Sequence, residues 1–250
     1  MTVLILVLLV LNLGITLYAA RKAFWAAKLA GGIPGRVDEM VRTATQQLEA
    51  RDVLLHRLGL PAGSLPPSRG WAASPDFLNH LLDAIEDTKA ETIVDCGSGL
   101  TTIVSALYLK QKGRGKVISL DHDPEFAGKT RLYLEKLGLS DFAEIQVAPL
   151  KEQMIGGETR SWYDLSRITL PDSVDLISVD GPPAILTGEE GRYPVGPVAF
   201  PKLRAGGLAI FDDAARPGEK RLVERLQREF PGLTLERRYA EKGCLVLRRA

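Results

Sequence analysis

Short apolar segments alternate with amphipathic ones between residues 92 and 230, and this alternation constrains the fold more than any other feature of the sequence. The apolar segments are predicted strands, at 92–96, 116–120, 144–147, 174–179 and 208–211. The amphipathic segments are predicted helices, at 101–111, 124–137 and 217–230. Strands that alternate with helices form a parallel, doubly wound sheet. The strands are too apolar for a sheet with one wet face, so helices should cover both faces.

The end of the chain breaks this pattern. Residues 233–241 and 244–248 are two predicted strands separated by a short turn that contains Gly243. Adjacent strands with a glycine turn are typical of a β-hairpin. The expected fold class is therefore α/β, with a mostly parallel seven-stranded sheet and a terminal antiparallel hairpin.

The first 20 residues contain no charged side chain, and the segment from Val3 to Ala20 is almost continuously aliphatic. Twenty helical residues at about 1.5 Å each match the roughly 30 Å hydrocarbon layer of a membrane. We therefore predict an N-terminal transmembrane helix over residues 1–22. The alternatives are a cleaved signal peptide, which would need a basic start and an A-x-A site, and a buried core helix.

Basic side chains follow this segment and none precedes it, at Arg21, Lys22, Lys28 and Arg36. By the positive-inside rule, the rest of the chain should face the cytoplasm from the inner (cytoplasmic) or another cellular membrane, as a single-pass protein. Phe24 and Trp25 stand where interfacial aromatic anchors would lie. Cys96 and Cys244 are far apart in sequence and fit reduced thiols in a cytosol-facing domain.

Residues 23–70 are predicted to form a juxtamembrane helix and a linker. Apolar side chains recur at helical spacing within 36–58 and make one apolar face. That face could pack on the domain, lie on the membrane surface or form a short coiled coil, so a homo-oligomer through 36–58 is one possibility. Residues 61–70 form a linker rich in Pro, Gly and Ser, and the domain should occupy 71–250.

The strongest site signal is a strand that runs into Gly97-Ser98-Gly99 and then opens a helix. Glycines allow a sharp turn and close approach to a ligand, and ligands of such sheets lie beyond the carboxyl ends of the strands. Asp121 ends the next strand, where a carboxylate accepts hydrogen bonds from ribose hydroxyls. The residues predicted to contact a cofactor are Asp95, Gly97, Ser98, Gly99, Asp121 and His122.

The charge of Asp95 distinguishes between cofactors. A carboxylate just before the glycine turn would repel the pyrophosphate of NAD, whereas S-adenosylmethionine (AdoMet) carries an ammonium and a sulfonium. Thr102 also replaces the third glycine of the dinucleotide fingerprint. The sequence thus favours AdoMet. The alternatives are an NAD-dependent oxidoreductase and a non-catalytic, membrane-tethered scaffold. Asp95 could also be a helix-capping acid, and Asp121 a solvated strand end.

From about Trp71 to Arg249 the chain resembles the class I AdoMet-dependent methyltransferases. The segment Asp95-Cys-Gly-Ser-Gly resembles the first motif of that family, and Asp121 resembles its ribose-binding acid. The resemblance implies a Rossmann-like fold and methyl transfer from AdoMet. Thr101 stands where many members carry a third glycine.

Three acids follow two neighbouring predicted strands: Asp180, Asp212 and Asp213. Clustered acids repel unless a cation neutralises them, and hard oxygen ligands suit Mg²⁺ or another divalent cation. The layout resembles metal-dependent O-methyltransferases, such as catechol O-methyltransferase and macrocin-type enzymes, so these three residues are the predicted metal ligands. Pro182 and Pro183 fill the places where those relatives carry a general base.

Asp180 is also the predicted catalytic residue, and the expected acceptor is a hydroxylated small molecule, lipid-linked molecule or glycan. The loops around the fourth predicted strand contain Trp162, Tyr163, Arg192 and Tyr193, and such loops shape substrate pockets in this fold class. Trp162 and Tyr163 could instead simply pack beneath a long loop. The formal net charge of +1 leaves no general basic field for nucleic acid.

Overall fold

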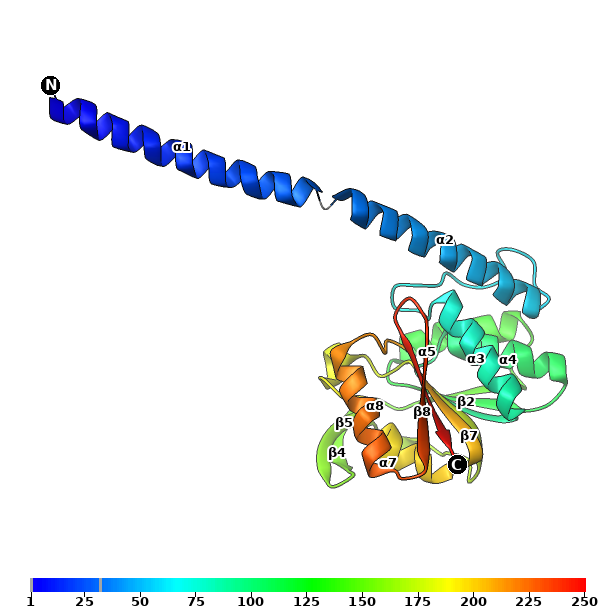
Figure 1. Cartoon of the computed structure of the whole chain (residues 1–250). Helices are drawn as coiled ribbons and strands as arrows, with labels where there is room; N and C mark the ends of the chain where they lie inside the picture. Colours follow the sequence, from blue (N-terminus) through cyan, green and yellow to red (C-terminus); the bar gives the residue numbers. More distant parts are fainter. Residues whose placement is uncertain (1, 32) are drawn as a thin grey trace. The chain divides into compact units, whose positions relative to one another are not determined.

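The computed structural model of the chain describes the backbone of residues 2–31 and 33–250, and the side chains of residues 7, 11–28, 31 and 35–250. The chain divides into two compact units, Met1–Gln46 and Gln47–Ala250. The first unit contains α1 (Thr2–Gly31) and the first half of α2 (Ile33–Arg57) (Figure 1). The second unit contains the α/β domain.

Helix α1 holds the segment predicted to cross a membrane. Within the residues that the structure describes, no helix combines the length and the apolar character that a membrane crossing needs. The transmembrane helix predicted over residues 1–22 is therefore not confirmed. Helix α1 continues without interruption through Arg21 and Lys22 to Gly31. Apart from Val7, the side chains before residue 11 lie outside the described residues.

The domain is built on one seven-stranded sheet in the order β3-β2-β1-β6-β7-β9-β8. Its strands are β1 (Thr92–Cys96), β2 (Lys116–Asp121), β3 (Ala143–Val147), β6 (Val174–Val179), β7 (Leu203–Phe211), β8 (Leu233–Arg238) and β9 (Cys244–Arg249). The first five strands are parallel to one another, and β9 pairs antiparallel with both β7 and β8. The predicted parallel sheet with a terminal hairpin is confirmed.

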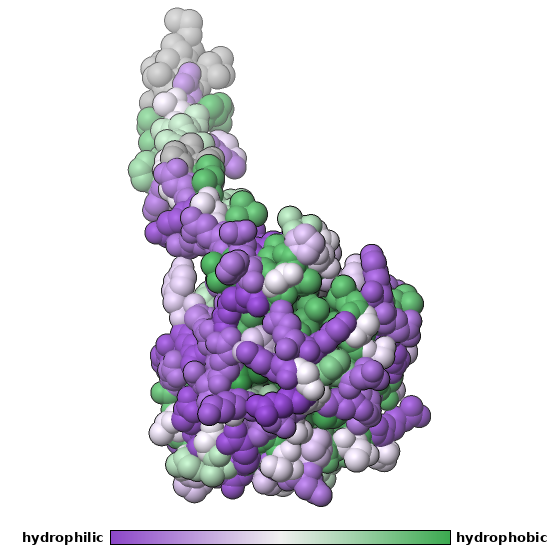
Figure 2. Space-filling model, turned by 90° about the vertical axis from the view of Figure 1, so that its right-hand side faces the viewer, coloured by the Kyte–Doolittle hydropathy of each residue, from purple (hydrophilic) through white to green (hydrophobic). Residues whose placement is uncertain are grey.

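Two apolar layers cover the sheet. Alternate strand residues point to opposite faces, so Ile93 joins one core cluster and Val94 the other. On the first face lie α3 (Pro75–Thr88), α4 (Leu100–Lys112) and α5 (Pro124–Lys136). On the second face lie α7 (Val195–Ala199) and α8 (Pro217–Glu229). On the surface in Figure 2, hydrophilic residues predominate over the domain and apolar areas are smaller.

A second, two-stranded sheet was not predicted from the sequence. This hairpin consists of β4 (Leu150–Ile155) and β5 (Glu158–Tyr163), joined at Gly156 and Gly157. Most of its side chains are exposed or half-buried, and they lack the apolar alternation that predicts strands. Its last two residues, Trp162 and Tyr163, are fully buried against the second face of the sheet.

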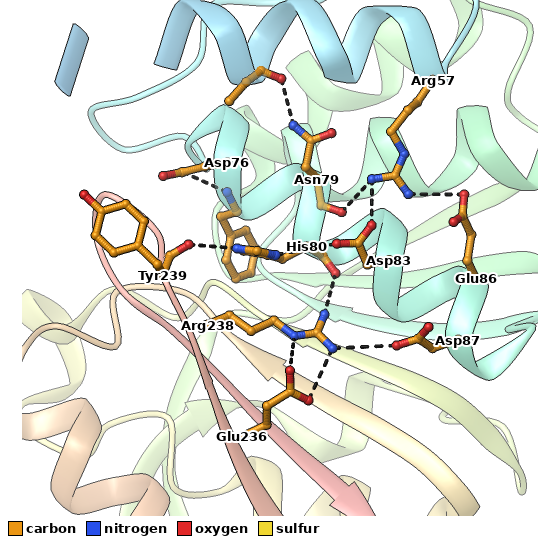
Figure 3. Close-up of polar contacts among 12 residues, drawn as sticks. Arg57, Asp76, Asn79, His80, Asp83, Glu86, Asp87, Glu236, Arg238 and Tyr239 are labelled. Carbon is orange, nitrogen blue, oxygen red and sulfur yellow. Dashed lines mark hydrogen bonds and ion pairs between the residues drawn. The ribbon is translucent and has the colours of Figure 1, made fainter. Parts of the chain in front are cut away.

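The end of α2 is fixed to the domain by polar contacts (Figure 3). Arg57 donates to Asp83 at 2.8 Å and lies 3.2 Å from Glu86, both on α3. Asn79 donates to the carbonyl oxygen of Ala50 at 2.7 Å. Helix α3 is in turn held to the β8–β9 hairpin, because His80 Nε2 lies 2.8 Å from the carbonyl oxygen of Tyr239.

Apolar packing reinforces these contacts. Leu54, Leu55 and Leu58 are buried in the core, so the last part of the predicted helix 36–58 packs on the domain. Earlier on the same helix Val41 and Leu48 are exposed. Self-association through 36–58 stays a prediction.

Candidate active site

A cavity of about 530 Å³ opens where β1, β2 and β6 end. Its walls come from the loops after these strands, from the segment before α3 and from α6 (Ala184–Thr187). The residues that line it include Trp71, Gly97, Ser98, Asp121, His122, Phe126, Tyr163, Asp180, Gly181, Ile185, Leu186, Arg192, Asp213, Arg216 and Lys242. Four of the six predicted cofactor residues and two of the three clustered acids therefore share one cavity.

Gly97 forms the sharp turn after β1. Its φ of +108° lies in the region that favours glycine. A Cβ at this position would lie 3.0 Å from the amide nitrogen of Gly181, the second residue after β6. The absence of a side chain at Gly97 thus lets the loops after β1 and β6 touch and form the floor of the cavity.

Asp121 ends β2 on the other side of the glycine turn. One carboxylate oxygen, Oδ2, accepts from the backbone amide of Ser98 at 3.2 Å and also from the Ser98 hydroxyl. The other, Oδ1, accepts from the Asp123 amide at 2.9 Å and lies 3.5 Å from His122 Nδ1. The carboxylate is therefore held at the cavity wall and is not a freely solvated strand end.

Asp95 lies elsewhere. Its side chain is fully buried and does not line the cavity, and Gly99 does not line it either. Asp95 Oδ2 accepts from the hydroxyls of Thr101 at 2.9 Å and Thr102 at 2.6 Å, both in the first turn of α4. This arrangement matches the helix-capping alternative. It also gives Thr101 and Thr102 a structural role at positions where glycine was expected.

Burial of the Asp95 carboxyl makes the stability of the folded protein depend on pH. Loss of solvation raises its pKa from 3.8 to about 6, against the opposing effect of the threonine hydrogen bonds. The folded protein therefore keeps this proton to a higher pH than the unfolded chain does. This stabilisation is fully present below about pH 4 and is lost as the pH rises through about 6.

We expect Asp95→Asn to remove this pH dependence, because the amide cannot ionise. The unfolding free energy of the wild type minus that of the variant should fall by ~3 kcal/mol between about pH 4 and about pH 7. Urea unfolding of both proteins across that range measures the difference. Other buried acids titrate in both proteins and cancel, so a difference that does not change with pH would contradict the assignment.

The three predicted acids converge. One oxygen from each of Asp180, Asp212 and Asp213 lies within 4.8 Å of the others. The reason is the strand order, since β6 and β7 are parallel neighbours and Val179 pairs with Phe211. Asp180 and Asp213 line the cavity, whereas Asp212 is fully buried behind them. Asp213 has a φ of +61°, a left-handed conformation that aspartate tolerates better than most residues.

Basic side chains already surround these acids. The guanidinium of Arg192, only 2% exposed, donates to Asp213 Oδ2 at 2.9 Å and lies 4.0 Å from Asp180 Oδ1. Arg216 lies 3.0 Å from Asp213 Oδ1, and the Lys242 amine lies 3.6 Å from Asp212 Oδ2. From the sequence, Arg192 was predicted only as a pocket residue and the other two were not predicted, because none is adjacent in sequence to a motif.

The predicted divalent-ion site can be tested against this arrangement. The spacing of the oxygens would suit an ion, but the charge of the cluster would not. A divalent ion that touches Asp180 and Asp213 would lie within a few ångströms of a permanently charged guanidinium in a poorly solvated site, where like charges repel strongly. With Arg192 in place the residues do not fit a divalent ion. The convergence of the acids is confirmed, and the metal is not.

The acids nevertheless have unusual protonation behaviour. Burial, followed by repulsion from Asp212, raises the pKa of Asp180 well above its usual range. Burial also raises the pKa of Asp212 and that of Glu219, a residue of α8 that lies 3.6 Å from Arg192 Nε. A carboxyl group with a raised pKa at a cavity wall is a common feature of catalytic sites.

Comparison with known proteins agrees with this geometry. Residues 94–214 match a family described as a methyltransferase domain. A search of curated protein sequences finds no match. The SAH-bound methyltransferase PaMTH1 of Podospora anserina is a structural neighbour with a TM-score of 0.58 and 15% identity, covering 85% of this chain and 96% of that one.

Two further structures have the same fold. The SAH complex of an O-methyltransferase from Bacillus cereus has a TM-score of 0.52 and 16% identity, covering 80% of this chain and 91% of that one. The cofactor-bound Rv0187 from MTB also has a TM-score of 0.52, with 19% identity, covering 83% of this chain and 89% of that one. The glycine turn, Asp121 and the sheet order agree with these matches: residues 94–214 match a methyltransferase domain, and the chain has the Rossmann-like fold of its structural neighbours.

Proposed function

We propose that the protein transfers the methyl group of AdoMet to a hydroxyl oxygen of a small or lipid-linked acceptor. The observation that carries this proposal is the shared cavity, which places Asp121 on one side of the Gly97 turn and Asp180 on the other. One of the structural neighbours, the Bacillus cereus protein, is an O-methyltransferase, which supports an oxygen acceptor.

AdoMet would lie across the glycine turn. The ribose hydroxyls would donate to Asp121, which is already oriented by Ser98 and Asp123. His122 would border the nucleoside, and the backbone of Gly97 and Ser98 would border the methionyl part. Asp95 would act from beneath, by holding the first turn of α4 in place.

The acceptor would lie over the end of β6. Its oxygen would attack the methyl carbon while the carbon–sulfur bond breaks and its electron pair neutralises the sulfonium. The hydroxyl proton would pass to Asp180, whose side chain is 14% exposed and lines the cavity. An in-line arrangement of oxygen, methyl carbon and sulfur would supply much of the rate, because placement replaces a bimolecular encounter.

The mouth of the cavity indicates an acceptor with an apolar part. Trp71, Phe126, Ile185 and Leu186 line the cavity and are each more than half exposed. Apolar side chains gathered at a pocket mouth are typical of ligand-binding grooves. Methyl transfer from labelled AdoMet to paired acceptors, each with its hydroxyl free or blocked, tests the proposal. Labelling of the blocked member would rule out the oxygen assignment.

Asp121→Ala should raise the dissociation constant for AdoMet by about 10- to 150-fold. The ribose hydroxyls would lose a charged acceptor, and such hydrogen bonds contribute about 1.5–3 kcal/mol. Titration calorimetry measures the constant, with Asp141→Ala, an exposed acid outside the cavity, as the control. An unchanged constant in a folded Asp121→Ala protein would exclude the ribose contact.

We also propose that residues 1–20 attach the enzyme to a membrane with the domain on the cytoplasmic side. The described apolar side chains of α1, among them Leu11, Leu13, Ile15 and Leu17, are all exposed. Such a helix needs an apolar surrounding, and a bilayer provides one. The full chain should remain in membranes after a carbonate wash, whereas a chain that starts at residue 23 should not. A mature N-terminus near Arg21 would instead identify a cleaved segment.

A further inference from the structure

Arg192 has contacts that no other basic residue of the cavity has. Its guanidinium donates to two backbone carbonyls, those of Asp180 at 2.8 Å and Asp212 at 3.0 Å. These are the first residues after β6 and β7, so one side chain joins the carboxyl ends of both strands. The same group donates to the side chain of Asp213 and lies 3.6 Å from Glu219.

The cluster contains nearly as many basic groups as carboxyl groups, without an added ion. Four carboxyl groups belong to it, at Asp180, Asp212, Asp213 and Glu219, together with three basic groups, at Arg192, Arg216 and Lys242. Of the three basic side chains, that of Arg192 is 2% exposed, that of Lys242 19% and that of Arg216 54%. Arg192 is therefore the cation in the interior of the cluster, where charge has the strongest effect.

We propose that the buried guanidinium of Arg192 occupies the electrostatic place of a divalent ion at the acid cluster and makes methyl transfer by this enzyme independent of metal. Arg192 is a positioning residue, because its guanidinium donates to the carbonyl oxygens of Asp180 and Asp212 and to the side chain of Asp213. It holds the backbone at Asp180 and Asp212 and supplies the fixed positive charge that lets Asp180 and Asp213 share one cavity wall. The kinetic part of this inference rests on the proposed function, whereas the part on ion binding does not.

The chemistry of the two cations explains why one would exclude the other. Arginine keeps its charge at every physiological pH and presents several donors in a rigid plane. Those donors satisfy two carbonyl oxygens and one carboxylate oxygen at once. An ion would have to displace these hydrogen bonds and leave a guanidinium buried without partners, which is strongly unfavourable.

The test measures the binding of Mn²⁺ directly, with calorimetry and with the electron paramagnetic resonance signal of the free ion as the two readouts. The full-length wild type should bind no Mn²⁺ at the cluster, with or without SAH. The double variant Arg192→Met with Glu219→Gln removes one positive and one negative charge together and retains the three aspartates. With the buried cation gone, and Arg216 and Lys242 left as more exposed partners of Asp213 and Asp212, it should gain a Mn²⁺ site, and a further Asp212→Asn change should abolish that site.

Each result decides the matter. Saturable Mn²⁺ binding to the wild type that Asp212→Asn abolishes would overturn the proposal, as would a folded double variant that still binds no ion. If the double variant does not fold, the wild-type titration decides alone. In the kinetic arm, transfer should persist in excess EDTA. Loss of transfer with AdoMet binding intact would refute metal independence, whereas loss of AdoMet binding would instead count against the proposed function.

Discussion

Asp180→Asn is expected to reduce turnover by about 100- to 10,000-fold, the usual contribution of a positioned proton acceptor. Asparagine has nearly the same shape but cannot take up the proton released when the acceptor oxygen is methylated. The dissociation constant for AdoMet should stay nearly unchanged, because Asp121, the proposed ribose contact, lies on the other side of the glycine turn. Single-turnover transfer from labelled AdoMet, together with calorimetry, separates the two quantities.

A matched control is available for this variant. Asp172 lies in the loop just before β6, is fully exposed and pairs only with Lys202. Asp172→Asn changes the same chemical group without touching the cavity, so its turnover should equal that of the wild type. If Asp180→Asn retained full turnover while folded, a different group would have to accept the proton.

Arg192→Met is expected to lower the free energy of unfolding by about 3–5 kcal/mol. Removal of one partner from a buried ion pair leaves charge without compensation, and methionine fills the volume but not the hydrogen bonds. The carbonyls of Asp180 and Asp212 would lose their donor as well. For a domain of this size the melting temperature should fall by roughly 6–20 °C, measured by circular dichroism.

Two comparisons show whether the effect comes from buried charge. Arg221→Met removes a half-exposed guanidinium that pairs with Glu189, and should cost no more than about 1 kcal/mol. Arg192→Met combined with Glu219→Gln should be less destabilising than Arg192→Met alone, because a carboxyl group is neutralised together with its partner. Equal losses in all three proteins would mean that Arg192 acts only through packing volume.

The strand positions could be predicted because each strand is a local pattern. Residues 92–96 and 174–179 are continuous apolar runs bounded by polar residues and glycines, and both match the observed strands β1 and β6. The starts of two helices could also be predicted from a local signal, since Pro124 and Pro217 begin α5 and α8. The β4–β5 hairpin was not predicted because most of its residues are exposed or half-buried and show no apolar period.

The candidate site divides in the same way. The sequence by itself determined the chemical identity of the cavity wall, with Gly97, Asp121, Asp180 and Asp213 at predicted strand ends. Strand order follows from side-chain packing across the whole sheet, but parallel neighbours always bring their carboxyl ends to one edge. That rule made the meeting of Asp180 with Asp212 and Asp213 predictable without coordinates.

Only the tertiary structure decided what these acids face. Asp95 was expected beside the cofactor, yet its side chain points below the turn to Thr101 and Thr102. Arg192 follows Asp180 by 12 positions in an irregular segment, and Lys242 lies in the turn of the terminal hairpin. No local sequence pattern determines where such loops lie relative to the ends of the strands. The counter-charge of the acid cluster, and with it the choice between a metal ion and a guanidinium, therefore depends on how distant segments pack together.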